Sequence, residues 1–154
     1  MLNLKKLLNK ITSAIVELTD WKDNTTTLLA QAADYGTGYS NIHSSDNPVS
    51  VKTGTHTNVG HITLPPGKYI AYSRIYFPTN GTGSRLLSMG GKSGQVNDRR
   101  VTSPGTDDGA LRLMCWYSFE LSTTTDIYAV AFQSSGSTMS ITASGLYAFK
   151  TGNI

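Results

Sequence analysis

The chain has few charged residues: Lys, Arg, Asp and Glu make up 15% of its 154 residues, against about 25% in average globular domains. Ser and Thr together supply about a quarter of the chain, and 15 residues are glycine. A surface rich in hydroxyl groups is typical of secreted or particle-borne β-proteins. An ordinary cytosolic β-sandwich is the alternative interpretation.

Cysteine occurs only once, at Cys115, so a disulfide within the chain is excluded. Cys115 lies in the run ALRLMCWYSFEL, which favours a buried apolar role. A thiol nucleophile would need a basic partner, and the sequence shows none beside it.

Long apolar runs are also missing, and none approaches the roughly 20 residues of a membrane-spanning helix. The N-terminal segment has early lysines, but Asn9, Lys10 and Glu17 interrupt its apolar part. No small-residue cleavage site follows, so neither a secretory signal nor membrane insertion is expected.

The formal charge of +3 and the pI of about 9.0 do not predict nucleic-acid binding. Four of the lysines lie within the first 22 residues, and the pair Arg99-Arg100 is followed by Asp107-Asp108. No recognised nucleic-acid-binding motif accompanies the charge.

Two segments show the two-residue alternation of β-strands, with bulky side chains on both faces. In the segment 69–77, one face carries Tyr69, Ala71, Ser73, Ile75 and Phe77. The second set consists of Tyr72, Arg74 and Tyr76, with Met114 and Trp116 in the segment 110–121. We predict that this second face is covered by another copy of the chain; stacking of a glycan on Trp116 is the alternative.

The first 24 residues predict an α-helix with an apolar seam at spacings of three and four. The seam consists of Leu4, Leu7, Ile11, Ala14, Leu18 and Trp21. Self-association, docking on a partner protein and packing within the chain all remain open.

Residues 25–48 read as a polar, glycine-containing connector. Residues 49–154 read as a β-domain of a sandwich or barrel type. The expected strands are 49–59, 61–64, 69–77, 85–89, 110–121, 126–133 and 139–150.

Three short motifs of the β-domain resemble the jelly roll of the C1q and tumour-necrosis-factor type, in the version found in bacteriophage tail and fibre proteins. They are a turn leading into Gly67-x-Tyr69, an Asn-x-x-Gly-x-Arg loop over 80–85, and a turn over 121–126. The resemblance covers residues 49–151. It implies a mainly β jelly-roll sandwich, a homotrimer, and surface recognition without catalysis.

The resemblance further implies a bacteriophage virion structural protein, exposed on the virion surface and made in the host cytoplasm. Its head would bind a host cell-surface saccharide or protein, and its N-terminal helix would bind other virion proteins. A capsid fibre or decoration protein with a purely structural role is the alternative.

Candidate ligand-binding residues lie mainly in the glycine-rich segment 90–109, which we expect to be a long loop on a rigid scaffold. They are Arg99, Arg100, Asp107 and Asp108, with Tyr35 and Tyr39 as possible stacking residues before the domain. For the two tyrosines, packing of the connector onto the head is an equal alternative.

The sequence predicts no enzyme, cofactor or metal site. His43, His56 and His61 lack a Cys or carboxylate at a metal-ligand spacing, although one histidine on a three-fold axis would supply three ligands. A hydrolase carboxylate pair such as Asp98 and Glu120 is the catalytic alternative.

Overall fold

The computed structural model describes residues 37–44 and 46–154. The predicted N-terminal helix with its seam, and Tyr35, lie outside these residues. Within the described part of the chain there are ten strands and no helix. The strands are β1 (Gly38–His43), β2 (Val49–Val51), β3 (Thr57–Leu64), β4 (Gly67–Phe77), β5 (Asn80–Gly90), β6 (Arg99–Thr106), β7 (Leu111–Leu121), β8 (Thr125–Gln133), β9 (Met139–Ile141) and β10 (Ser144–Gly152).

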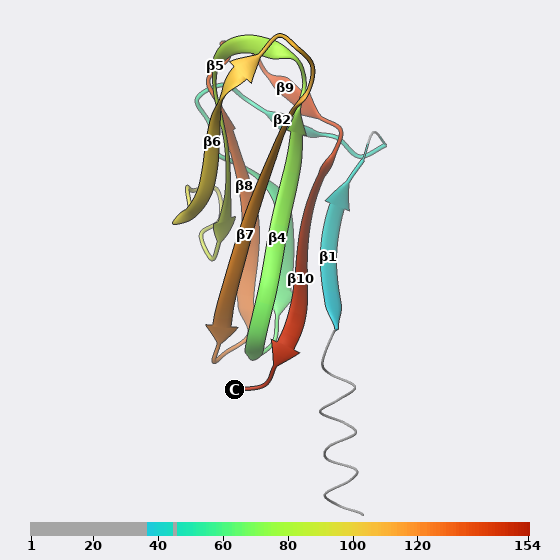
Figure 1. Ribbon diagram of the computed structural model, residues 1–154, viewed down its shortest axis with the longest axis vertical. Helices are drawn as coiled ribbons and strands as arrows, with labels where there is room; N and C mark the ends of the chain where they lie inside the picture. The colour runs from blue at the N-terminus through green and yellow to red at the C-terminus, as the bar shows by residue number, and fades with distance from the viewer. Residues whose placement is uncertain (1–36, 45) are drawn as a thin grey trace, which may run out of the picture. The chain divides into compact units, whose positions relative to one another are not determined.

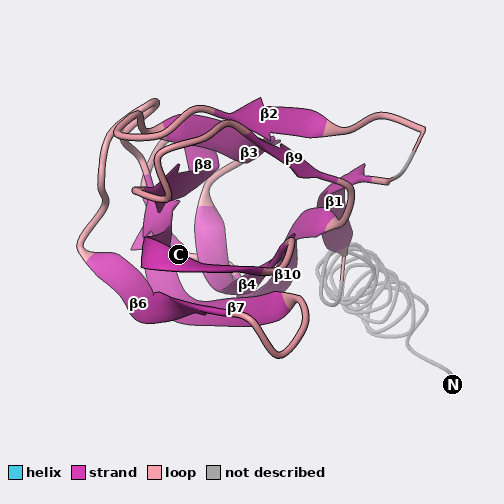
Figure 2. Cartoon of the chain, turned by 90° about the horizontal axis from the view of Figure 1, so that it is seen from above, coloured by secondary structure: helices cyan, strands magenta, loops and turns pink. Residues whose placement is uncertain are grey.

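The strands form two four-stranded antiparallel sheets and one small strand pair (Figures 1 and 2). The front sheet has the order β1-β10-β4-β7, and the back sheet has the order β3-β8-β5-β6. The chain crosses between the sheets at β3 to β4, β4 to β5, β6 to β7 and β7 to β8. This order is that of a jelly-roll sandwich, so the predicted mainly β fold is confirmed.

The core lies between the two sheets and follows the alternation of the sequence. In β4, the inward residues, among them Tyr69, Ile75 and Phe77, are almost completely buried, and the residues that alternate with them are exposed or half-buried. Leu64 from β3 and Leu87 from β5 are fully buried in the same cluster. Burying each such side chain contributes about 1.5–3 kcal/mol to folding.

Gln133 is a buried polar residue that joins β8 to neighbouring segments. Its Nε2 donates to the carbonyl oxygens of Val51 (3.0 Å) and Ser137 (2.6 Å). Its Oε1 accepts from the backbone N–H and the hydroxyl of Ser135. Each polar atom of the amide has a hydrogen-bond partner, and these bonds compensate for the cost of removing the amide from water.

The first part of β5, residues 80–85, is held by the fully buried Arg85. The Arg85 guanidinium donates to the carbonyl oxygens of Asn80 (2.9 Å), Thr82 (2.9 Å) and Ser84 (3.0 Å). It also lies 5.9 Å from the centre of the Phe77 ring, and burial lowers the pKa of the guanidinium from its ordinary value. The arginine therefore fixes the segment 80–85 that the sequence singled out.

The structure corrects several of the predicted strand boundaries. The expected single strand 49–59 is divided by a turn at Gly54, whose φ of 72° favours glycine: its start forms β2, and its end joins the expected strand 61–64 in β3. The segment 80–85, expected as a loop, is the first part of β5. The expected strand 139–150 is divided into β9 and β10. The end of the expected connector forms β1, which pairs with β10 at the edge of the front sheet.

A further correction concerns the segment 90–109, which is not one long loop. Its second half forms β6, which pairs with β5 through Arg85↔Ser103 and Leu87↔Val101. Pro104 and Gly105 disfavour a strand, but β6 is an edge strand, where proline is tolerated because one side needs no donor.

Candidate functional site

The outward face of the front sheet carries three aromatic rings in a row. Tyr147 in β10, Tyr72 in β4 and Trp116 in β7 are direct cross-strand partners. The ring centres of Tyr147 and Tyr72 are 4.7 Å apart, and those of Tyr72 and Trp116 are also 4.7 Å apart. The interplanar angles are 8° and 25°. We call these three residues the aromatic row.

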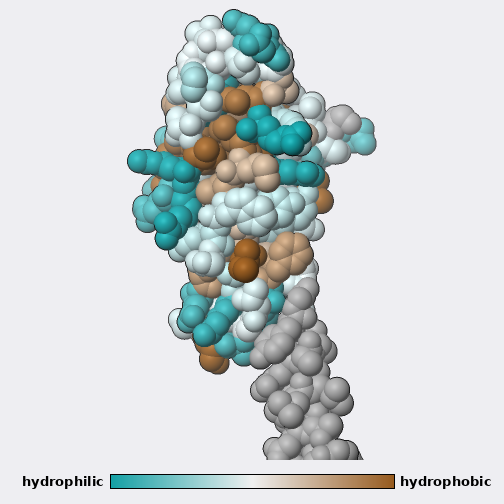
Figure 3. Space-filling view, viewed as in Figure 1, coloured by the Kyte–Doolittle hydropathy of each residue, from teal (hydrophilic) through white to brown (hydrophobic). Residues whose placement is uncertain are grey.

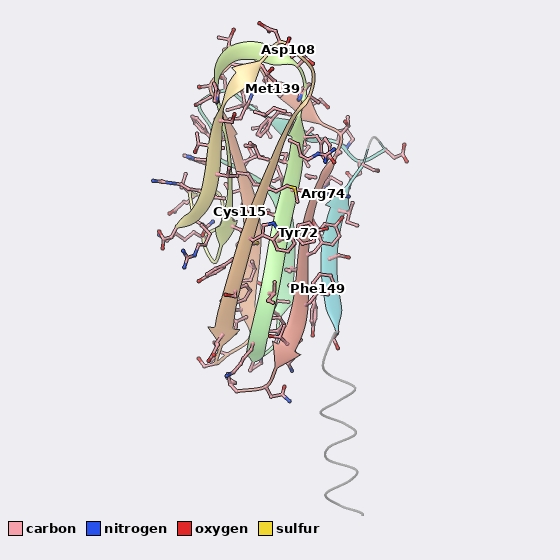
Figure 4. The ribbon with its side chains drawn as sticks, in the orientation of Figure 1. Tyr72, Arg74, Asp108, Cys115, Met139 and Phe149 are labelled. Carbon is pink, nitrogen blue, oxygen red and sulfur yellow. The ribbon has the colours of Figure 1, made fainter. Side chains whose placement is uncertain are left out.

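Apolar and cationic side chains surround the aromatic row (Figures 3 and 4). Arg74 donates to the Tyr147 hydroxyl at 3.3 Å, and Arg112 lies 4.7 Å from the centre of the Tyr76 ring. The large exposed apolar side chains of this face are Ile42, Ile70, Met114, Trp116 and Phe149, which are 43–60% exposed. A patch of this kind, rimmed by polar groups, marks an interaction surface.

The stacking of the rings bears on the two interpretations of this face. Tyr72 stacks between Tyr147 and Trp116, so both of its flat faces are used within the row. Trp116 ends the row and is 60% exposed, and a sugar packs its C–H groups against an exposed ring face. The geometry therefore allows both contact with protein and stacking of a glycan on Trp116.

All five predicted interface residues (Tyr72, Arg74, Tyr76, Met114 and Trp116) lie on this one face. The sequence analysis did not assign the neighbours from other strands: Ile42, Tyr147 and Phe149. The alternation within β10 was visible in the sequence. Only the sheet order places β10 between β1 and β4 and completes the patch.

The predicted ligand-binding residues do not form one site. Arg99 and Arg100 are adjacent in β6, so their side chains leave opposite faces of the strand. Asp107 follows the other end of β6, roughly 26 Å from Arg99 at 3.3 Å per residue. Its Oδ1 accepts from the backbone N–H of Gly81 at 2.7 Å, and Asp108 lies exposed at the tip of the same turn (Figure 4).

Tyr39 packs against the domain. It lies in β1 and is half-buried, and its ring centre is 6.1 Å from that of Tyr69 in an edge-to-face arrangement. This contact corresponds to the packing alternative for Tyr39.

A cleft of about 430 Å³ lies beside the C-terminal half of β7. Its lining includes Arg99 at the start of β6 and Tyr117 and Phe119 of β7. The guanidinium of Arg99 lies 5.0 Å from the centre of the Tyr117 ring. In this cleft Arg99, one of the predicted ligand-binding residues, therefore lies beside half-buried aromatic side chains.

The three histidines lie at separate places. The ring of His56 lies 5.0 Å from that of Phe132, and His43 Nδ1 lies 3.2 Å from the carbonyl oxygen of Asn47. His61 stacks on Tyr128 with ring centres 4.7 Å apart. Among residues 37–44 and 46–154, no group of three or more His, Cys, Asp or Glu side chains is placed to hold a metal ion.

Cys115 is buried in the core, and burial raises the pKa of its thiol, against a smaller opposing effect of the Arg99 charge. The thiol is therefore held in its protonated, unreactive form. None of the described residues belongs to a helix long and apolar enough to cross a membrane.

The carboxylate of Asp126 is held by its neighbours on the back sheet. The Thr63 hydroxyl donates to Asp126 Oδ1 at 2.7 Å, and His61 Nε2 lies 3.2 Å from the same oxygen. These hydrogen bonds lower the pKa of Asp126 from its ordinary value, and the bond from Thr63 has the largest effect.

We expect Asp126 to make stability depend on acid pH. Because its pKa is lowered in the folded protein, its contribution is present above the ordinary aspartate pKa and is lost as the pH falls through the lowered value. Melting temperatures of the parent and Asp126→Asn, measured from pH 7 to about pH 2, check this. The parent should lose more on acidification than the variant; equal losses would contradict the expectation.

Comparison with known proteins gives the class of the fold. A scan against protein-family models and a search of curated proteins each found no match. Among solved structures, the chain is similar to the PRD1 vertex protein P5, with a TM-score of 0.54 and 14% identity over 75% of this chain and 73% of that chain.

Two further similar structures have lower TM-scores. The Eiger TNF from S. frugiperda has a TM-score of 0.49 and 14% identity, over 78% of this chain and 95% of that chain. The VP2 subviral particle of infectious bursal disease virus has a TM-score of 0.47 and 16% identity, over 77% and 33%. The jelly-roll fold that the resemblance implies is confirmed by the strand order and by the similarity of fold to the PRD1 vertex protein P5.

Proposed function

We propose that this chain is a bacteriophage virion structural protein whose jelly-roll domain forms a trimeric, host-recognising head of a tail fibre or baseplate. The observation that carries the proposal is the aromatic row with its exposed apolar surround, which needs a protein partner. The fold shared with a PRD1 vertex protein supports a place on the virion surface.

The charges on the outward face favour a cyclic trimer rather than a two-fold symmetric dimer. Lys68 and Glu120 lie 3.2 Å apart and compensate each other, which leaves Arg74 and Arg112 as the net charge of the face. A two-fold contact would place this face against itself and bring like charges together. A cyclic trimer places the face against a different surface of the neighbour and avoids that repulsion.

Recognition of the host by this head needs a direct binding test. The full chain, labelled with a fluorophore, is incubated with a panel of bacterial cell-wall polysaccharides and with intact cells of the same strains. Saturable binding to one surface supports a recognition head. Binding to none of them would favour the alternative, a capsid fibre or decoration protein with a purely structural role.

The head is expected to fold without residues 1–24. Residues 37–44 and 46–154 supply both four-stranded sheets and the core between them, so we expect deletion of 1–24 to leave a folded β-domain. Circular dichroism and thermal melting compare the deletion variant with the full chain. A melting temperature lower by more than about 10 °C would place the segment in the core of the head.

The same deletion tests the proposed attachment role of residues 1–24. We expect the deletion variant to keep its head folded and to lose binding to other virion proteins. Incorporation into particles, measured by quantitative mass spectrometry of purified virions, separates the two effects. Normal incorporation of the deletion variant would contradict attachment through this segment.

A further inference from the structure

The cleft beside β7 is formed because two neighbouring edge strands differ in extent. β6 begins at Arg99, which lies over Tyr117, whereas β7 continues to Leu121 (Figure 1). The inward side of this last part of β7 is therefore not covered by β6. Tyr117, Phe119 and Leu121 are half-buried there, whereas Leu113 and Cys115 higher on the same side are buried.

Aromatic side chains form one wall of the cleft. The ring centres of Tyr117 and Phe119 are 4.9 Å apart, and Phe119 is held from behind by the buried Tyr69 at 5.8 Å. The wall is therefore fixed by core packing. The negative face of an aromatic ring attracts the C–H groups of a ligand that packs against it.

The opposite wall is fixed by a network centred on Asn97, which is only 3% exposed. The Asn97 amide accepts from the backbone N–H of Lys92 at 2.8 Å and donates to the Lys92 carbonyl oxygen at 3.1 Å. Its backbone N–H donates to the Ser88 hydroxyl at 3.2 Å. Both walls are thus formed before any ligand binds, which lowers the entropic cost of binding.

The rim of the cleft supplies both hydrogen-bond donors and acceptors. Lys92 and Arg99 are cationic and Asp98 is anionic, whereas the carboxylate of Glu120 is paired with Lys68 at 3.2 Å. An anionic ligand would meet the carboxylate of Asp98, and a cationic ligand would meet two cations. A neutral ligand with several hydroxyl groups meets donors and acceptors together, since Lys and Arg only donate and carboxylates only accept.

We infer that this cleft binds one neutral pyranose unit of a surface polysaccharide, with the C–H face of the sugar on Tyr117 and Phe119 and its hydroxyl groups on the charged rim. Its volume of about 430 Å³ falls within the range of small-ligand pockets, roughly 300–1,000 Å³. This inference rests on the proposed recognition function and names its ligand class. Strong avidity would come from several heads on one particle.

The test uses the full chain and five methyl glycosides: those of glucose, galactose, rhamnose and N-acetylglucosamine, and the anionic glucuronide as comparator. Binding is measured by saturation-transfer-difference NMR and by titration of the protein's backbone amide signals. We expect at least one neutral glycoside to bind and to shift the amide signals of Tyr117 and Phe119. Binding of none of the four, or at least tenfold tighter binding of the glucuronide, would overturn the inference.

Arg99→Ala and Arg100→Ala are a matched pair, because each removes one cation from β6, on opposite faces of the strand. Arg99→Ala should weaken glycoside binding roughly tenfold, the usual effect of losing a charge-assisted hydrogen bond, and Arg100→Ala should leave it unchanged. Equal effects of both variants would overturn the cleft assignment. Tyr117→Leu provides a second check, because it keeps apolar volume and should also weaken binding.

Failure of this inference differs from failure of the proposed function. If the parent binds host cells but no neutral glycoside, only the cleft assignment is wrong. If the parent binds glycosides in the cleft but adsorbs to no cell, the cleft stands and host recognition is wrong.

Discussion

Replacing Trp116 by Glu is expected to convert the proposed trimer into monomers. Trp116 belongs to the aromatic row and is 60% exposed in the single chain. A contact that covers this face would therefore bury it. Loss of a buried aromatic contact typically costs about 2–4 kcal/mol. The unpaired carboxylate adds a desolvation cost, so association should weaken by roughly a thousandfold or more.

Light scattering after size-exclusion chromatography measures this change. Thr102→Glu is the matched control, because it adds the same charge at an exposed position of the back sheet, and it should leave the mass unchanged. Circular dichroism establishes whether the Trp116→Glu chain is folded. A Trp116→Glu protein with the mass of the parent trimer would contradict the assignment of this face.

Replacing Arg85 by Met is expected to produce the largest loss of stability within one chain. The guanidinium is fully buried and donates to three carbonyl oxygens of the segment 80–84. The variant removes these charge-assisted hydrogen bonds, each worth about 1.5–3 kcal/mol. Water replaces the donor at the exposed Thr82, whereas Asn80 and Ser84 are half-buried. We expect the free energy of unfolding to fall by about 3 kcal/mol, the lower end of that range for two such bonds.

Urea unfolding of the variant and the parent measures this loss. Arg100→Met is the control, since Arg100 is exposed on β6 of the same sheet and exposed positions usually change stability by less than about 0.5 kcal/mol. Arg85→Lys should recover only part of the loss, because an ammonium group cannot span the same three acceptors. Equal stability of Arg85→Met and Arg100→Met would contradict the conclusion that Arg85 fixes the segment 80–85.

The outward face of the front sheet was predictable because it depends on alternation within single strands. The pattern of β4 places Tyr72 and Tyr76 opposite the buried Tyr69 and Phe77, and the structure has the same faces. What the sequence did not show is the order of the strands. Tyr147 stacks on Tyr72 only because β10 pairs with β4, from which it is far removed in the sequence.

The structure of the segment 90–109, which holds the predicted ligand-binding residues, was less predictable, because it depends on tertiary pairing. The β6 sequence RRVTSPGT contains Pro and Gly, which indicate a turn when read locally. Pairing with β5 overrides that preference and separates Arg99 from Arg100 and from Asp107. The cleft was not predictable, since it depends on where β6 begins relative to β7.

The mass of the parent chain in solution tests the proposed trimer most directly. Native mass spectrometry and light scattering on the 154-residue chain, at concentrations from micromolar to nanomolar, give the oligomeric state without substitution. We expect a single species with three times the 16.6 kDa mass of the chain. A monodisperse 16.6 kDa monomer throughout this range would contradict it, because the exposed aromatic face would then have no partner copy.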